Sequence, residues 1–83
     1  MGALSKMPNI GKVLERVLAE AGIDTPEKLC TLGSRDAFIR ISSIEPDACL
    51  NKLYALEGAI QNMRWHNLPE EKKKELKSFF QTL

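Results

Sequence analysis

The longest amphipathic segment of the chain is centred on Cys49-Leu50-Asn51-Lys52-Leu53-Tyr54-Ala55-Leu56-Glu57-Gly58-Ala59 and covers residues 46–63. Apolar side chains recur there every three or four positions, the spacing that places them on one face of an α-helix. This stripe consists of Cys49, Leu53, Leu56, Ile60 and Met63, and it is widened by Leu50, Tyr54, Ala55 and Ala59. Because so broad an apolar surface is typical of a helix that other helices surround, the segment predicts a central helix, opened by Pro46-Asp47, in an all-helical fold.

Two residues of this segment are unusual for a buried helix. Gly58 costs about 1 kcal/mol relative to alanine in a helix interior, and a close helix crossing would explain that cost. Glu57 places a carboxylate among apolar neighbours. This carboxylate is either a functional group, which contacts a ligand or acts in acid–base chemistry, or half of an ion pair. The candidate partner for an ion pair is Arg64, seven positions later on the same helix face. The ion pair is the preferred interpretation, because charged side chains are rarely buried without a partner.

Three shorter helices are predicted before the central one. The first has an unbroken apolar stripe and stops at Gly22, a residue type common just past helix ends. That stripe consists of Ile10, Val13, Leu14, Val17, Leu18 and Ala21. The second begins at Thr25-Pro26-Glu27, where threonine suits the cap and proline the first turn, and it ends at Gly33. Ser34 is expected to cap the third helix. Its core face consists of Ala37, Phe38 and Ile41, with Ile44 at its end.

A fifth helix is predicted to begin at Pro69-Glu70-Glu71, after a link over residues 64–67. Its apolar stripe consists of Leu76, Phe79, Phe80 and Leu83. Because all the connections are short, the sequence predicts a compact bundle of five helices in a single domain over residues 1–83. Residues 1–6 are expected to form a flexible N-terminus.

The composition does not favour a nucleic-acid or membrane surface. The 83 residues include 12 basic and 11 acidic side chains, which give a net charge of +1 and a pI of about 7.8. Nucleic-acid-binding domains more often have a pI above about 9. No apolar run approaches the roughly 20 residues of a membrane span, and no signal peptide is visible. Met1-Gly2 does not begin a myristoylation motif, because Lys6 stands where serine or threonine is required.

The two cysteines, Cys30 and Cys49, do not form a CxxC pair. Each lies in a helical pattern, where a free cysteine behaves as a small buried apolar residue. We therefore expect reduced thiols and a cytoplasmic protein.

Residues 7–12, Met7-Pro8-Asn9-Ile10-Gly11-Lys12, are similar to the hairpin of helix-hairpin-helix elements. In such hairpins a glycine-containing turn directs backbone N–H groups at a helix start toward a phosphate. Asn9 stands where the first glycine usually lies, and asparagine tolerates left-handed backbone angles. Asn9, Ile10, Gly11 and Lys12 are therefore candidates for nucleic-acid binding. The alternative is that the turn only packs Ile10 and positions the first helix, and the low net charge favours this alternative.

Five segments follow one another in a characteristic order: residues 7–12, 22–25, 32–38, 49–59 and 64–69. Together they resemble the C-terminal domain family of the bacterial competence regulator TfoX, over about residues 7–80. The resemblance implies a helical protein linked to the regulation of natural transformation, without catalytic residues. The family's Leu-Tyr-Ala-Leu-Glu-Gly and Arg-Trp-His segments occur here, and they single out structural or interaction residues. These are Tyr54, Glu57, Gly58, Arg64 and Trp65.

No pattern of catalytic or metal-binding residues stands out. The spacing of Cys30, Cys49 and His66 fits no usual zinc site. Tyr54 and Trp65 are interpreted as core or rim packing rather than as a base-stacking platform, because stacking proteins interleave aromatic with basic residues. We therefore expect a non-enzymatic module without cofactor, metal or membrane, which binds another protein or itself. Weak, sequence-independent DNA binding through residues 9–12 is the alternative.

Overall fold

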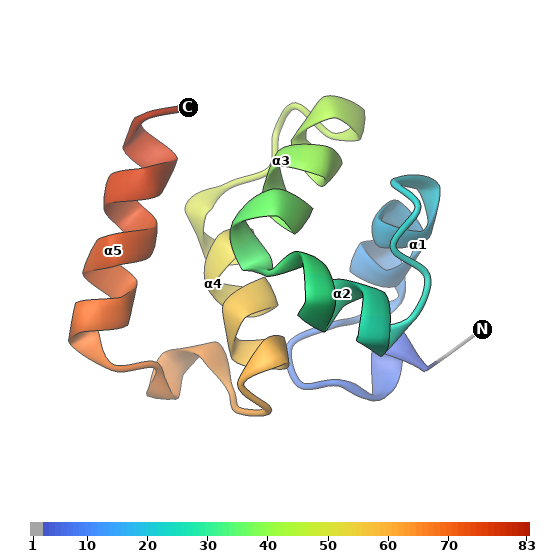
Figure 1. Ribbon diagram of the computed structural model, residues 1–83, viewed down its shortest axis with the longest axis horizontal. Coiled ribbons are helices and arrows are strands. Elements are labelled where there is room, and N and C mark those ends of the chain that lie inside the picture. Colours follow the sequence, from blue (N-terminus) through green and yellow to red (C-terminus); the bar gives the residue numbers. More distant parts are fainter. Residues whose placement is uncertain (1–2) are drawn as a thin grey trace.

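The central helix, α4, spans Leu50–Ile60, and α2, α3 and α5 all contact it (Figure 1). This computed structural model describes residues 3–83. They form five α-helices and two short 3-10 turns, without a strand. The remaining helices are α1 (Lys12–Glu20), α2 (Pro26–Leu32), α3 (Ser34–Ile44) and α5 (Glu70–Gln81), and the 3-10 turns are η1 (Leu4–Lys6) and η2 (Trp65–Asn67). The predicted all-helical class and the five helices are confirmed.

The central helix is shorter than the sequence predicts. Pro46-Asp47 form a turn rather than the first helical residues, and Cys49 is the extended N-cap, with a φ of −109°. At the other end Asn62 takes a left-handed φ of 59°, and the N–H of Met63 donates to the Gly58 carbonyl oxygen at 2.8 Å. This closure satisfies a carbonyl of the last turn and stops the helix at Ile60.

The helix boundaries upstream follow the predicted signals. Thr25 caps α2, because its Oγ1 accepts a hydrogen bond from the N–H of Lys28 at 3.1 Å. Gly22, with a φ of 85°, ends α1 in the left-handed conformation that disfavours side chains. Within residues 3–83, no helix has both the length and the apolar character needed to cross a bilayer.

The hydrophobic core lies between α4 and the helices around it. Its fully buried members come from every α-helix, from η1 and from the loop after α1, and they include Leu4, Leu18, Ile23, Leu29, Phe38, Ile41, Leu53, Leu56 and Leu76. Leu4 corrects one expectation, because the sequence predicts a flexible N-terminus over residues 1–6. Leu4–Lys6 instead form η1, whose leucine is 1% exposed; residues 1 and 2 lie outside the described part of the chain.

Several apolar residues predicted to be buried lie on the surface. Val13, Ile44 and Leu83 are 59%, 39% and 61% exposed, respectively. Each of them lies at an end of its helix or just beyond it. The apolar stripe of each helix therefore continues past the stretch that neighbouring helices cover. Cys30 and Cys49 are also exposed, which corrects their assignment to the core, and both are free thiols.

Candidate functional site

The hairpin before α1 contains the four residues to which the sequence assigns nucleic-acid binding. Asn9 adopts a φ of 70°, so it does take the left-handed conformation of the glycine that it replaces. Ile10 is only 5% exposed and belongs to the core. Of the four candidates, Gly11 and Lys12 are the two that are exposed at the start of α1.

The Asn9 side chain points inward and joins the hairpin to the far end of α4. Its Nδ2 donates to the carbonyl oxygens of Met63 at 2.9 Å and Ala55 at 3.4 Å. Its Oδ1 accepts a hydrogen bond from the backbone N–H of Trp65 at 3.1 Å. Because both ends of the amide are engaged by the protein, Asn9 is a structural link between segments more than 40 positions apart and does not face a ligand.

Gly58 lies directly against this link. A Cβ atom at this position would come within 2.5 Å of Asn9 Nδ2 and 2.8 Å of the Met63 carbonyl oxygen. These separations are shorter than van der Waals contact, so any side chain would displace the hairpin or the turn after α4. The predicted close approach is therefore present, but a loop and a turn make it, rather than a crossing helix.

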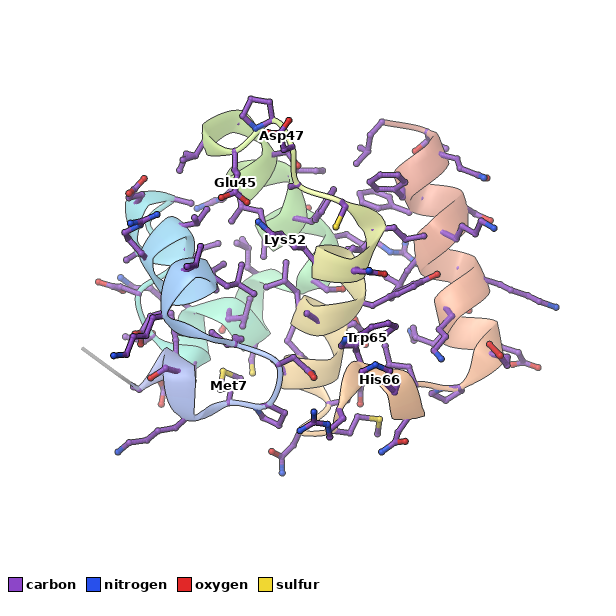
Figure 2. The ribbon with its side chains drawn as sticks, turned by 180° about the vertical axis from the view of Figure 1, so that it is seen from behind. Met7, Glu45, Asp47, Lys52, Trp65 and His66 are labelled. Carbon is purple, nitrogen blue, oxygen red and sulfur yellow. The ribbon has the colours of Figure 1, made fainter. Side chains whose placement is uncertain are left out.

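Beside the hairpin, an open cleft of about 380 Å³ separates the first turn of α1 from α4. Lys12 and Val13 border it on one side, and Asn51 and Lys52 border it on the other. The Lys52 ammonium forms an ion pair with Glu45, toward which it extends in Figure 2. One of the two lysines is therefore already neutralised within the protein, which lowers the positive potential of this cleft.

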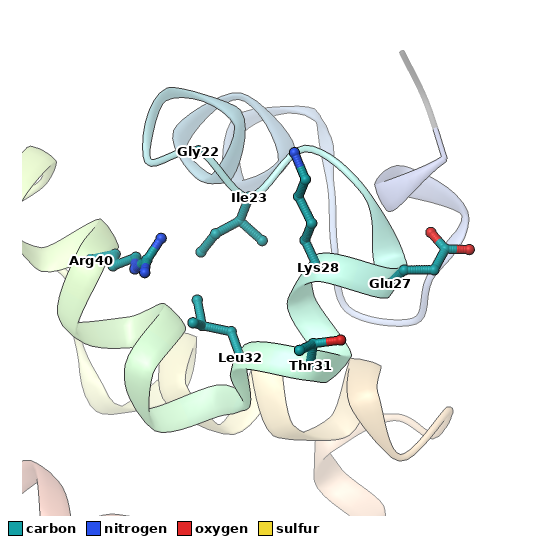
Figure 3. A pocket seen from close by; sticks show the side chains of 7 residues that line it. All are labelled: Gly22, Ile23, Glu27, Lys28, Thr31, Leu32 and Arg40. Atoms are coloured by element: carbon teal, nitrogen blue, oxygen red, sulfur yellow. The ribbon is translucent and has the colours of Figure 1, made fainter.

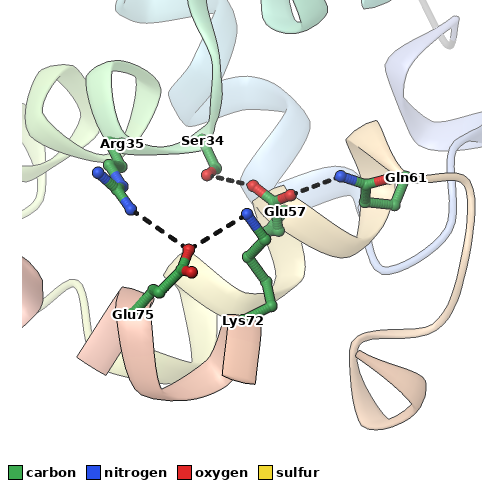
Figure 4. A network of polar contacts seen from close by, with 6 residues as sticks. All are labelled: Ser34, Arg35, Glu57, Gln61, Lys72 and Glu75. Carbon is green, nitrogen blue, oxygen red and sulfur yellow. Dashed lines mark hydrogen bonds and ion pairs between the residues drawn. The ribbon is translucent and has the colours of Figure 1, made fainter. Parts of the chain in front are cut away.

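Glu57 is 8% exposed and is held by two uncharged side chains (Figure 4). Ser34 Oγ donates to Oε1 at 2.6 Å, and Gln61 Nε2 donates to Oε2 at 2.8 Å. The predicted ion pair with Arg64 is wrong: Arg64 lies beyond the end of α4, where the left-handed turn at Asn62 redirects the chain. The carboxylate thus lies at the first turn of α3, whose partial positive charge favours an anion.

The same contact explains why Ser34 does not cap α3 as the sequence predicts. Gly33 occupies the N-cap position with a φ of 90°, and Ser34 is the first helical residue. Its hydroxyl is directed to Glu57 instead of to a backbone N–H. The sequence offers no signal for this pairing, because 23 residues separate the two side chains.

Three rings are stacked between the end of α4 and the start of α5. Tyr54 and Trp65 lie 5.6 Å apart between ring centroids, and Trp65 and His66 lie 4.0 Å apart. Figure 2 shows Trp65 and His66 side by side. Lys73 Nζ lies 5.9 Å from the Trp65 centroid and donates to the His66 carbonyl oxygen at 3.2 Å. Trp65 is half-buried and stacks with both Tyr54 and His66, which is compatible with the predicted packing role.

Chemistry-bearing side chains are dispersed over the part of the chain that the structure describes. Within residues 3–83, no three His, Cys, Asp or Glu side chains lie close enough together to hold a metal ion. His66 is exposed and is stacked on Trp65 rather than placed beside a nucleophile. Both oxygens of the buried Glu57 carboxylate accept hydrogen bonds, one from Ser34 on α3 and one from Gln61 at the end of α4.

Comparison with known proteins places the chain in a family. The sequence profile of the TfoX C-terminal domain matches residues 1–80 of the 83. The chain belongs to the TfoX C-terminal domain family. No curated protein matches it.

Solved structures share the fold of this TfoX C-terminal domain along most of their length. A triclinic crystal form of an uncharacterized protein from Listeria monocytogenes is 56% identical, with a TM-score of 0.94 over 95% of this chain and 90% of that one. A tetragonal crystal form of a Listeria monocytogenes protein of unknown function is 55% identical, with a TM-score of 0.91 over 94% of this chain and 96% of that one.

The family segments that the sequence singled out come together at one end of this TfoX C-terminal domain. Gly58 leaves room for the Asn9 amide, which binds the backbone of Trp65, and Tyr54 stacks on the Trp65 ring. Arg64 precedes this cluster and is exposed. The clustering gives Tyr54, Gly58 and Trp65 a structural role in joining the hairpin, α4 and η2.

The Ser34–Glu57 contact predicts a measurable loss of stability. We expect Glu57→Gln to lower the free energy of unfolding by about 1–3 kcal/mol, because a buried charge-assisted hydrogen bond is weakened and the helix start loses its anion. Ser34→Ala should cost about as much, and the double variant should cost less than the sum. Urea denaturation of the four proteins measures this coupling. Strictly additive losses would show that the two side chains act independently.

Proposed function

We propose that this TfoX C-terminal domain is a non-enzymatic module that binds another protein. An open apolar cleft between α3 and α5, of about 370 Å³, carries this proposal. Its lining contains no charged residue and consists of Phe38, Ile39, Ser42, Pro46, Ala48, Phe80 and Leu83. In this proposal the regulatory role linked to competence, which membership of the family suggests, is exerted by binding rather than by chemistry.

The geometry of α5 explains why this cleft stays open. The helix packs on α4, and it meets α3 through the edge contact of Phe38 with Phe80, at 5.8 Å, and through Arg35 over Phe79, at 5.5 Å. Beyond these contacts Ile39 is 46% exposed, and Leu83 is more exposed still. Exposed apolar side chains that border one cleft are typical of surfaces where another protein binds.

The test compares two glutamate substitutions at exposed apolar residues. Ile39→Glu places a charge in the α3–α5 cleft, whereas Val13→Glu places one on α1, outside it. Both variants should fold as the wild type does, since neither side chain belongs to the buried core. A partner captured from native cells, identified and then purified, should bind the wild type and Val13→Glu alike. It should bind Ile39→Glu at least tenfold more weakly.

Calorimetric titration of the purified partner measures these affinities. If the partner binds Ile39→Glu and the wild type with equal affinity, the α3–α5 cleft is not part of the binding site. Failure to find any protein that binds the wild type would contradict the proposed function itself.

A second candidate function, weak binding of DNA, is favoured by Lys12 at the exposed start of α1. Backbone N–H groups and the helix dipole at such a position suit a phosphate. Lys12 lies across the cleft from Asn51 and Lys52, but Glu45 neutralises Lys52. Lys12 is the one lysine of this cleft without an ion pair within residues 3–83, and the net charge is +1, so we expect a dissociation constant of about 10⁻⁴ M or weaker at physiological salt.

Fluorescence anisotropy with duplex DNA over a salt series tests this second function. Each neutralised phosphate should contribute a slope of about −0.9 to the logarithmic salt dependence. Lys12→Glu should weaken the residual binding, whereas Lys77→Glu, an equal change of charge on α5, should have a smaller effect. Micromolar binding at about 150 mM salt that Lys12→Glu abolishes would place DNA binding ahead of protein binding.

A further inference from the structure

A third cleft lies between α2, α3 and the loop that follows α1 (Figure 3). Its volume is about 320 Å³. Ile23 and Leu32 form an apolar floor, and Figure 3 shows their side chains directed toward each other. Thr31 lies at the edge of this floor on α2. The α2–α3 cleft, as we call it, therefore offers aliphatic contact at its base.

The free charge at this cleft is a guanidinium. Arg40 reaches into it from α3 and forms no ion pair within residues 3–83. Lys28 is already engaged, since its ammonium lies 2.9 Å from Asp24 Oδ1 and its hydrogen bond holds the pKa of Asp24 below its ordinary value. The carboxylate of Glu27 is directed away from the floor. Arg40 is therefore the cation available to a ligand.

The distribution of charge selects the class of ligand. A planar guanidinium binds a carboxylate through two parallel hydrogen bonds. A polyanion such as nucleic acid would bring further phosphates toward Glu27, which lines the cleft, and toward Asp24, which pairs with the lining residue Lys28; both carboxylates would repel them. The charges thus suit a ligand that carries a single carboxylate near Arg40 and an aliphatic group over Ile23 and Leu32.

The shape of the cleft favours a segment of protein over a small molecule. Pockets for small ligands enclose most of the ligand surface, whereas this cleft is open to solvent. We propose that the α2–α3 cleft binds an acidic peptide segment of a partner protein. An aliphatic side chain of the segment contacts Ile23 and Leu32, and a neighbouring Asp or Glu carboxylate pairs with Arg40. This inference is independent of the α3–α5 cleft, although both sites would serve a protein-binding module.

A library of random displayed peptides, selected on the whole domain, tests this proposal and requires no purified partner. Retained peptides are synthesised, and their affinities are measured by fluorescence polarisation. We expect them to share an aliphatic residue next to Asp or Glu. Arg40→Glu should weaken binding at least tenfold, and Thr31→Trp should weaken it by filling the edge of the cleft while leaving every charge in place. Arg64→Glu, an equal change of charge on an exposed residue of the link before η2, should leave affinity unchanged.

The decisive measurement pairs a protein variant with a peptide variant. Changing the peptide carboxylate to its amide should weaken binding to the wild type, but by less than Arg40→Glu does, because Arg40→Glu also adds repulsion between two carboxylates. The amide should not weaken binding to Arg40→Glu any further, because the ion pair is already lost and the amide removes that repulsion. Circular dichroism confirms that each variant is folded.

Other outcomes would overturn the proposal. These are a library that yields no binder, binders without a carboxylate, and binders that Arg64→Glu weakens as much as Arg40→Glu. Binders lost only with Ile39→Glu would also overturn it, while they would support the proposed function through the α3–α5 cleft.

Discussion

Leu53→Ala is expected to lower the free energy of unfolding by about 2–5 kcal/mol, the range for truncations in a packed core. Leu53 is 0% exposed and lies in the middle of α4, the helix that α2, α3 and α5 all contact. Removing its branched end leaves a cavity that several elements would have to close together. Domains of this kind are stable by only about 5–15 kcal/mol in total, so the loss is a large fraction.

Thermal and urea denaturation followed by circular dichroism measure this effect. Each 1 kcal/mol should lower the melting temperature by about 4–8 °C in a domain of this size. Val13→Ala is the matched control, because Val13 is 59% exposed and its truncation should change stability by no more than about 0.5 kcal/mol. Equal midpoints for Leu53→Ala and the wild type would mean that this face of α4 is not the core.

The sequence predicts helices well in this chain because the local signals are strong. The spacing of apolar residues locates every α-helix, and the Thr25 cap and the Gly22 stop lie where local chemistry requires them. The errors lie at the ends of helices. Val13 and Leu83 continue an apolar stripe beyond the area that a neighbouring element covers. Periodicity alone does not reveal where that coverage stops.

The contacts between distant segments are beyond the reach of the sequence. Proximity along the chain suggests Arg64 as the partner of Glu57. In the structure the Glu57 carboxylate instead accepts a hydrogen bond from Ser34 on another helix. The left-handed turn predicted at Asn9 is confirmed, yet its amide binds Met63 and Trp65 instead of leaving the hairpin free for phosphate. The residue type at a turn indicates the backbone conformation there from local sequence alone. The hydrogen-bond partner of its side chain depends on the packing of the whole chain.

The location of the candidate binding surfaces also depends on packing. Ile39 falls between the core residues Phe38 and Ile41 of α3, yet it is 46% exposed and lines the α3–α5 cleft. Arg40 is one of several exposed basic residues in the sequence. It becomes a candidate for recognising a carboxylate because Ile23 and Leu32 form an apolar floor beside it.

Gly58→Ala is expected to destabilise the protein even though alanine is the better helix former. Relief of the glycine penalty should contribute about 1 kcal/mol in favour of the variant. Against it, the added methyl group would lie 2.5 Å from Asn9 Nδ2, 2.8 Å from the Met63 carbonyl oxygen and 3.1 Å from Trp65 Cα. Overpacking of this kind typically costs about 1–3 kcal/mol. Breaking the hydrogen bonds of the partly buried Asn9 amide adds about 1 kcal/mol.

We therefore expect a net loss of about 2 kcal/mol for Gly58→Ala, measured by urea denaturation with Trp65 fluorescence as a local probe. Gly11→Ala is the control, because a Cβ atom there meets nothing within 4 Å and its φ of −94° suits any residue; it should cost about 1 kcal/mol or less. Asn9→Gly keeps the left-handed turn and removes the nearest clashing group. Combined with Gly58→Ala, it should cost less than the sum of the two single changes. A Gly58→Ala variant as stable as the wild type would mean that the hairpin does not approach α4 this closely.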